Sequence, residues 1–142
     1  MSQRYVLTVE LKDDPAVVDA YIRYHRDVWP EVQASLRRVG VQQMDIYLVG
    51  RRLVMVVDMD DGLDYRVAFR AHAASSPRVA EWERLMKSLQ QPAAEARAGE
   101  SWAVMESVFH LDVEKGSDPS RSRSIEQQEP AIADIADPSH TS

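Results

Sequence analysis

The chain has 142 residues, of which 44% are apolar and 28% charged, and it contains no cysteine. This is ordinary globular composition, so we expect one domain with its own core. The absence of cysteine excludes disulfides, thiolate metal sites and a cysteine nucleophile, and is typical of a cytoplasmic protein. No apolar stretch approaches the roughly 18 residues of a membrane span, so no membrane association is expected.

The net charge of −6 is unevenly distributed. Residues 112–142 carry seven acidic and three basic side chains, which leaves the first 111 residues nearly neutral. Nucleic-acid binding depends on clustered Lys and Arg, so we exclude nucleic acid as a partner.

The first predicted elements are a strand and a broken helix. Residues 5–11 alternate with aromatic and branched side chains on one face, which predicts a strand. A capping Asp14 before Pro15 opens a helix that we expect to reach Val28. The proline after Trp29 disfavours continued helix, so a second helix over 30–39 is predicted before Gly40.

Residues 41–49 and 53–60 form two strand-like runs whose short separation predicts a β-hairpin. The run Leu53–Val57 is apolar on both faces and must be covered on both. Helices can cover one face, and a second copy of the same sheet is the expected cover for the other. We therefore expect a homodimer.

The second half of the chain repeats the strand-and-helix alternation. Helices are predicted over 63–73 and 77–89, a loop over 91–100 and a final strand over 101–111. The order β, α, β, β, α, β predicts an α+β ferredoxin-like fold in residues 1–111. Residues 112–142, rich in Ser, Pro, Asp and Glu, are predicted to be a disordered acidic tail.

One helical face carries candidate chemistry. Tyr21, His25 and Trp29 are four residues apart and therefore neighbours on a helix. Aromatic rings with polar tips can hold a sugar, and an imidazole can exchange a proton near neutral pH. The alternative is that the three side chains form the apolar stripe of a packed helix.

The other histidines, His72, His110 and His140, have no such companions and are interpreted as structural or surface residues. No metal or nucleotide motif is present in the sequence, so neither a metal nor a cofactor is predicted.

Two further places combine an apolar wall with a carboxylate, which is the combination that a sugar site uses. Trp82 is followed by Glu83 on a helix, and Met44 is followed by Asp45 in the hairpin. Trp82 is also a natural core residue. Strand alternation places Met44 and Asp45 on opposite faces.

These residues resemble the L-rhamnose mutarotase family over roughly residues 4–111. The resemblance is carried by Tyr21 and His25, Val28-Trp29-Pro30-Glu31, Gly40, Ile46-Tyr47-Leu48, Trp82 with Met86, and Glu106-Ser107-Val108-Phe109. It implies a homodimeric ferredoxin-like α/β barrel that interconverts the α and β anomers of a deoxy-sugar without a cofactor. By the resemblance, His25 is the proton-donating catalytic residue, and Tyr21 and Trp82 bind the sugar.

Two positions depart from the rhamnose-type pattern. Met44 stands where that pattern has a tyrosine, and Glu83 stands where it has a second tryptophan. Together with Asp45 and Glu81-Trp82-Glu83, these residues look more like a subgroup associated with L-fucose. L-fucose is therefore the favoured substrate and L-rhamnose the next.

Ring opening requires one acid and one base. The base that acts with His25 stays open among Asp45, Glu83 and a water molecule. Two other classes remain, because this fold serves several functions. One is a cofactor-free monooxygenase or haem-handling protein, and the other is a sugar-binding dimer without catalysis.

Overall fold

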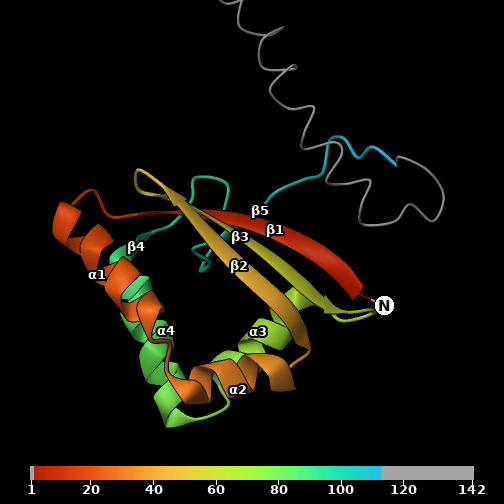
Figure 1. The fold of residues 1–142 in the computed structure, drawn as a ribbon, viewed down its shortest axis with the longest axis horizontal. Coiled ribbons are helices and arrows are strands. Elements are labelled where there is room, and N and C mark those ends of the chain that lie inside the picture. The colour runs from red at the N-terminus through yellow and green to blue at the C-terminus, as the bar shows by residue number, and fades with distance from the viewer. Residues whose placement is uncertain (1, 113–142) are drawn as a thin grey trace, which may run out of the picture. The chain divides into compact units, whose positions relative to one another are not determined.

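The computed structural model describes residues 2–112. The chain divides into one compact unit that ends at Glu106 and a second that begins at Ser107. The first unit is an antiparallel sheet with four helices on one face (Figure 1). The predicted α+β class is confirmed. The predicted tail, apart from its first residue, lies outside the described residues.

The sheet has the strand order β2-β3-β1-β4, and β5 also pairs with β1. The strands are β1 (Ser2–Leu11), β2 (Val41–Val49), β3 (Arg52–Asp60), β4 (Gln90–Gln91) and β5 (Ala103–Val104). All pairings are antiparallel, and the predicted hairpin is β2–β3. In this register Leu7 and Ile46 both lie beside Met55, which aligns the inward side chains of three strands.

The helices begin where the sequence provides caps. They are α1 (Pro15–Arg26), α2 (Pro30–Arg38), α3 (Tyr65–Ala73) and α4 (Pro77–Leu89). The side chains of Asp14, Asp64 and Ser76 accept hydrogen bonds from backbone N–H groups of the first turns of α1, α3 and α4. The first helix ends at Arg26, before the predicted Val28, because Asp27 leaves the helical conformation.

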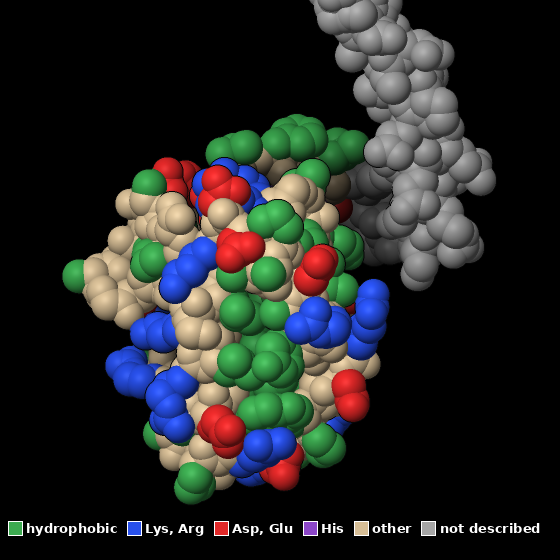
Figure 2. Space-filling model, turned by 90° about the vertical axis from the view of Figure 1, so that its left-hand side faces the viewer, with side chains coloured by type: hydrophobic (Ala, Val, Ile, Leu, Met, Phe, Trp, Pro, Cys, Tyr) green, Lys and Arg blue, Asp and Glu red, His purple; other side chains and the backbone are tan. Residues whose placement is uncertain are grey.

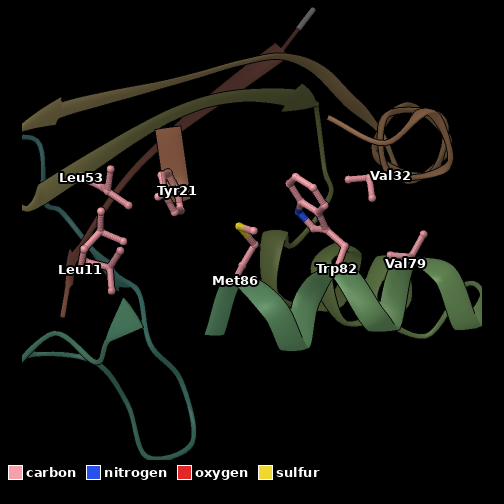
Figure 3. Close-up of a cluster of buried hydrophobic side chains, with 8 residues drawn as sticks. Leu11, Tyr21, Val32, Leu53, Val79, Trp82 and Met86 are labelled. Atoms are coloured by element: carbon pink, nitrogen blue, oxygen red, sulfur yellow. The ribbon is translucent and has the colours of Figure 1, made fainter. Parts of the chain in front are cut away.

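The core lies between the sheet and the helices. Figure 3 shows one of its two clusters, in which Trp82 and Met86 project from α4 toward the sheet. The cluster consists of Val9, Leu11, Tyr21, Val32, Leu53, Val79, Trp82 and Met86. Leu11 and Leu53 are fully buried, as the predicted alternation of β1 and β3 requires.

The predicted final strand over 101–111 is wrong in length. Only Ala103 and Val104 form β5, and the Met105 N–H donates one more bond to the Val6 carbonyl. An alternating sequence becomes a strand only where a neighbouring backbone completes the ladder. Nothing within residues 2–112 pairs with residues 106–111. Of the predicted loop, Gln91 belongs to β4.

The sheet face away from the helices is open and has an apolar centre, with the Arg4–Asp58 and Arg52–Glu10 ion pairs toward its two ends and Asp45 beside Val56. Val6, Val54 and Val56 are half-buried there, while Tyr47 and Val49 on β2 are 62% and 73% exposed. Such a face is a candidate interface, because large contiguous apolar surfaces on soluble proteins usually bind something.

Elsewhere the surface is mixed in charge. On the side shown in Figure 2, Lys and Arg alternate with Asp and Glu around a central apolar strip. No helix among the described residues is long and apolar enough to cross a membrane.

Of the described glycines with positive φ, Gly40 is expected to tolerate a side chain less well than Gly62. Its φ is +106°, and an added Cβ would collide with the Leu63 side chain, whereas Gly62, at +84°, has open space. Gly40→Ala should therefore lower the free energy of unfolding by about 1–3 kcal/mol more than Gly62→Ala, because both carry backbone strain but only one is overpacked. Urea unfolding of the two variants measures the difference, and equal losses would contradict the close approach at Gly40.

Candidate functional site

A cavity of about 1270 Å³ opens between the sheet and the helices. We call it the sheet–helix cavity. Its lining comes from all four helices, from β1, β2 and β3, and from the segment that follows α4. Residues from distant parts of the sequence therefore meet in one place.

Five of the six predicted site residues line this cavity. They are Tyr21, His25, Met44, Trp82 and Glu83. Asp45 does not line it, because β2 alternates and Met44 is the residue that faces the helices. Of the two hairpin candidates, only Met44 therefore lies at the cavity.

His25 lies between two aromatic neighbours. Its ring stacks on Tyr21 with 4.1 Å between centroids and meets Trp82 edge-on at 5.5 Å. Trp82 in turn contacts Trp29 at 5.0 Å. The predicted face of Tyr21, His25 and Trp29 is therefore correct only in part: Trp29 lies beyond the end of α1, just before α2, and does not line the cavity. Trp82 of α4 provides the second aromatic neighbour of His25 instead, and it belongs both to the core and to the cavity wall.

One nitrogen of the His25 ring is already engaged in a hydrogen bond within the protein. Nδ1 lies 2.9 Å from the Tyr21 carbonyl oxygen, which can only accept, so Nδ1 carries the proton. Burial lowers the pKa of His25 below its ordinary 6.5, and the Tyr21 carbonyl only partly offsets this. Near neutral pH the imidazole is therefore uncharged and has a lone pair on Nε2.

Tyr21 keeps its proton throughout the working pH range. Burial raises the pKa of its hydroxyl far above 10, and the nearby charge of Glu83 adds to the effect. At the cavity wall the hydroxyl can thus serve as a hydrogen-bond donor.

His72 is the main residue that the sequence interpretation missed. It is 3% exposed, lines the cavity, and lies with Nδ1 2.7 Å from Ser35 Oγ and Nε2 3.4 Å from Glu83 Oε2. A signal existed: Tyr65, Ala68 and His72 follow one inward helical face. His110 is exposed, as expected, and His140 lies outside the described residues.

Gln90 and Trp102 also line the cavity and were not predicted to do so. Both follow α4: Gln90 comes directly after it, and Trp102 lies at the start of the predicted final strand. Their position depends on the short pairings of β4 and β5 with β1. Among residues 2–112, no three His, Asp or Glu side chains gather closely enough to hold a metal ion.

Comparison with known proteins points to one family. A family profile described as L-rhamnose mutarotase matches residues 4–111. The chain is 38% identical over 122 residues to an L-fucose mutarotase of Xanthomonas campestris pv. campestris, covering 81% of this chain and 96% of that one. It is 32% identical over 111 residues to a UPF0734 protein of Dictyostelium discoideum, covering 76% and 89%.

Among solved structures, the chain is similar to an L-rhamnose mutarotase from Formosa agariphila. The TM-score is 0.56 at 20% identity, and the match covers 78% of this chain and all of the other. The similarity confirms the ferredoxin-like fold.

We expect His25 to titrate below 6.5, because its burial penalises the imidazolium form. NMR titration of the ring C–H signals measures this, with the urea-unfolded protein as reference. A folded-state value equal to or above the unfolded one would contradict the desolvated environment.

Proposed function

The chain belongs to the L-rhamnose mutarotase family and is a sugar mutarotase of the rhamnose/fucose type, and we propose that it interconverts the anomers of a 6-deoxyhexose, L-fucose before L-rhamnose. The observation that carries the proposal is the uncharged His25 in the sheet–helix cavity. Its Nε2 has no hydrogen-bond partner among residues 2–112, and aromatic rings lie on either side. This arrangement suits proton exchange with a bound sugar hydroxyl.

Two cavity residues support fucose over rhamnose. Met44 and Glu83 replace aromatic side chains of the rhamnose-type pattern, so the wall offers a thioether and a carboxylate where that pattern offers rings. A carboxylate accepts hydrogen bonds from sugar hydroxyls, so polar contacts would replace the ring contacts of the rhamnose-type pattern. The 38% identity to an L-fucose mutarotase agrees with this preference.

The sugar would lie with its apolar face against Trp82 and its hydroxyls toward Tyr21 and Glu83. Trp82 lines the cavity, is 4% exposed and is held rigidly by its neighbours. The Tyr21 hydroxyl, which stays protonated, donates to a sugar oxygen.

Ring opening then begins at the anomeric hydroxyl. His25 Nε2 takes its proton, the bond between C1 and the ring oxygen breaks, and the ring oxygen gains a proton from an acid. Rotation about the C1–C2 bond turns the aldehyde, and the reverse transfers close the ring on its other face. The resemblance gives His25 a proton-donating role, and that role belongs to the closing half, when Nε2 returns the proton.

We also propose that the protein is a homodimer through the open sheet face. The half-buried Val54 and Val56, with exposed Tyr47 and Val49, form a flat apolar surface that a second sheet can cover.

Exchange NMR on equilibrated L-fucose should show faster transfer between the α and β anomeric protons when the protein is added. L-rhamnose should be accelerated less. His25→Asn should reduce the acceleration by about 10²- to 10⁴-fold, the usual contribution of a positioned proton-transfer group. The matched control is His110→Asn, at an exposed position outside the cavity, which should keep full activity.

Sugar binding without exchange in the wild-type protein would support the non-catalytic alternative. Exchange at the wild-type rate in folded His25→Asn would remove His25 from the mechanism.

The homodimer predicts that Val56→Glu weakens association, because it places a desolvated carboxylate in the centre of the interface. Light scattering after size exclusion measures the mass. Val67→Glu is the control, since Val67 lies 58% exposed on α3, in the helical layer. A wild-type mass of one chain would contradict the proposed dimer.

A further inference from the structure

A chain of hydrogen bonds runs behind the cavity wall. The Ser75 hydroxyl donates to the His72 carbonyl oxygen at 2.7 Å. Ser75 Oγ lies 2.9 Å from Ser35 Oγ, which in turn lies 2.7 Å from His72 Nδ1. We call this the Ser75–Ser35–His72 chain. It links α2, α3 and the turn before α4.

The number of protons in the chain decides the state of His72. A hydroxyl has one proton, and that of Ser75 is used on the His72 carbonyl. The hydrogen bond between the serines must therefore use the proton of Ser35. Ser35 Oγ can then only accept from the imidazole, so His72 Nδ1 is a donor.

The second ring nitrogen faces a carboxylate. His72 Nε2 lies 3.4 Å from Glu83 Oε2, and the His72 side chain is 4% exposed. With Nδ1 protonated, a neutral His72 would point the lone pair of its buried ring at a charged carboxylate oxygen 3.4 Å away, and this repulsion is unfavourable. One proton between Nε2 and Oε2 removes the conflict, whichever atom carries it.

We propose that His72 and Glu83 share one proton at the wall of the cavity, and that Glu83 is the acid that delivers it to the ring oxygen of the sugar. Glu83 touches the substrate and is the catalytic residue, while His72 acts through it as a positioning residue. Glu83 is suited to this role because its side chain is 42% exposed and lines the same cavity as His25. This inference rests on the proposed function.

The step balances without a co-reactant. On opening, His25 Nε2 gains the proton of the anomeric hydroxyl, and the electron pair of that O–H bond forms the carbonyl. The pair of the broken C1–O bond stays on the ring oxygen, which takes the proton of the His72–Glu83 pair. On closing, both protons return, so the protein regains its starting state.

Ser35, His72 and Glu83 do not form a catalytic triad with Ser35 as the nucleophile, because the count of protons above excludes it. A nucleophilic serine needs an imidazole nitrogen that accepts its proton. Here Nδ1 donates to Ser35, which is 1% exposed and does not line the cavity.

The state of His72 can be read directly from its ring ¹⁵N shifts in the full chain. In the wild-type protein Nδ1 should show the shift of a protonated nitrogen. Ser75→Ala frees the Ser35 proton for Nδ1, so His72 should change to the tautomer with its proton on Nε2. A wild-type Nδ1 that carries a lone pair, or an unchanged tautomer in Ser75→Ala, would overturn the proton count.

The kinetic test measures kcat and KM for fucose anomer exchange. Glu83→Gln should lower kcat by about 10²-fold or more with a smaller change in KM. The control is Glu81→Gln, two residues away on α4 and outside the cavity, which should match the wild type. Wild-type kcat in Glu83→Gln would overturn the assignment of the acid.

Ser75→Ala should also lower kcat, although Ser75 does not line the cavity, because the rearranged chain no longer leaves a shared proton on Glu83. Ser88→Ala is its control, since that exposed hydroxyl bonds only its own helix. In Ser75→Ala/Glu83→Gln the loss should equal that of Glu83→Gln alone, because both act through one proton. Additive losses would contradict the coupling.

Different results would reject the mutarotase proposal and the proposal that Glu83 is the acid. No exchange of either sugar by the wild-type protein would reject the mutarotase, while the ¹⁵N shifts would still report the shared proton. Wild-type exchange with an active Glu83→Gln would keep the mutarotase and reject the acid.

Discussion

The burial of Trp82 is the constraint on which both the core and the site depend. Its indole is 4% exposed and lies within 6.2 Å, centroid to centroid, of the rings of Tyr24, His25 and Trp29. Edge-to-face pairs of this kind contribute about 0.5–1.5 kcal/mol each beyond the area they bury. They fix α4 against α1 and the start of α2, and thereby fix the helical wall of the cavity.

A site made from core side chains is rigid by construction. Tyr21 and Trp82 belong to a packed cluster, and close-packed interiors leave little room for a ring to move. His25 cannot turn freely either, because Nδ1 is held by the carbonyl of the preceding turn. In the proposed mechanism, folding therefore sets the geometry of proton exchange before any sugar arrives, which is what positioned acid–base catalysis requires.

Local signals predicted most of the fold. Asp14 caps α1 where the sequence indicated, and the alternation of the hairpin correctly separated Met44 from Asp45. The last strand was less predictable, because alternation describes the two faces of a segment but not whether a partner backbone exists. The structure provides that partner only for Ala103, Val104 and the N–H that follows.

The site was predictable where residues share a helix and not where they meet across the fold. Tyr21 and His25 are one turn apart, so their contact could be inferred from spacing. His72 and Glu83 come from different helices, and Ser35 from a third. Only tertiary structure brings such groups together. The protons of the serine hydroxyls can be assigned to hydrogen bonds only after these contacts are known.

The two histidines of the cavity show how partners assign roles to one residue type. His25 donates to a neutral carbonyl, is desolvated, and faces the cavity with Nε2 unprotonated, which suits the role of base that we propose for it. His72 donates to a hydroxyl whose own proton is already used, and its Nε2 faces a carboxylate, which suits the proposed role of holding a proton in place. One cavity can therefore offer both an acid and a base to the proposed reaction, because the hydrogen-bond partner of Nδ1 and the group opposite Nε2 differ between the two rings.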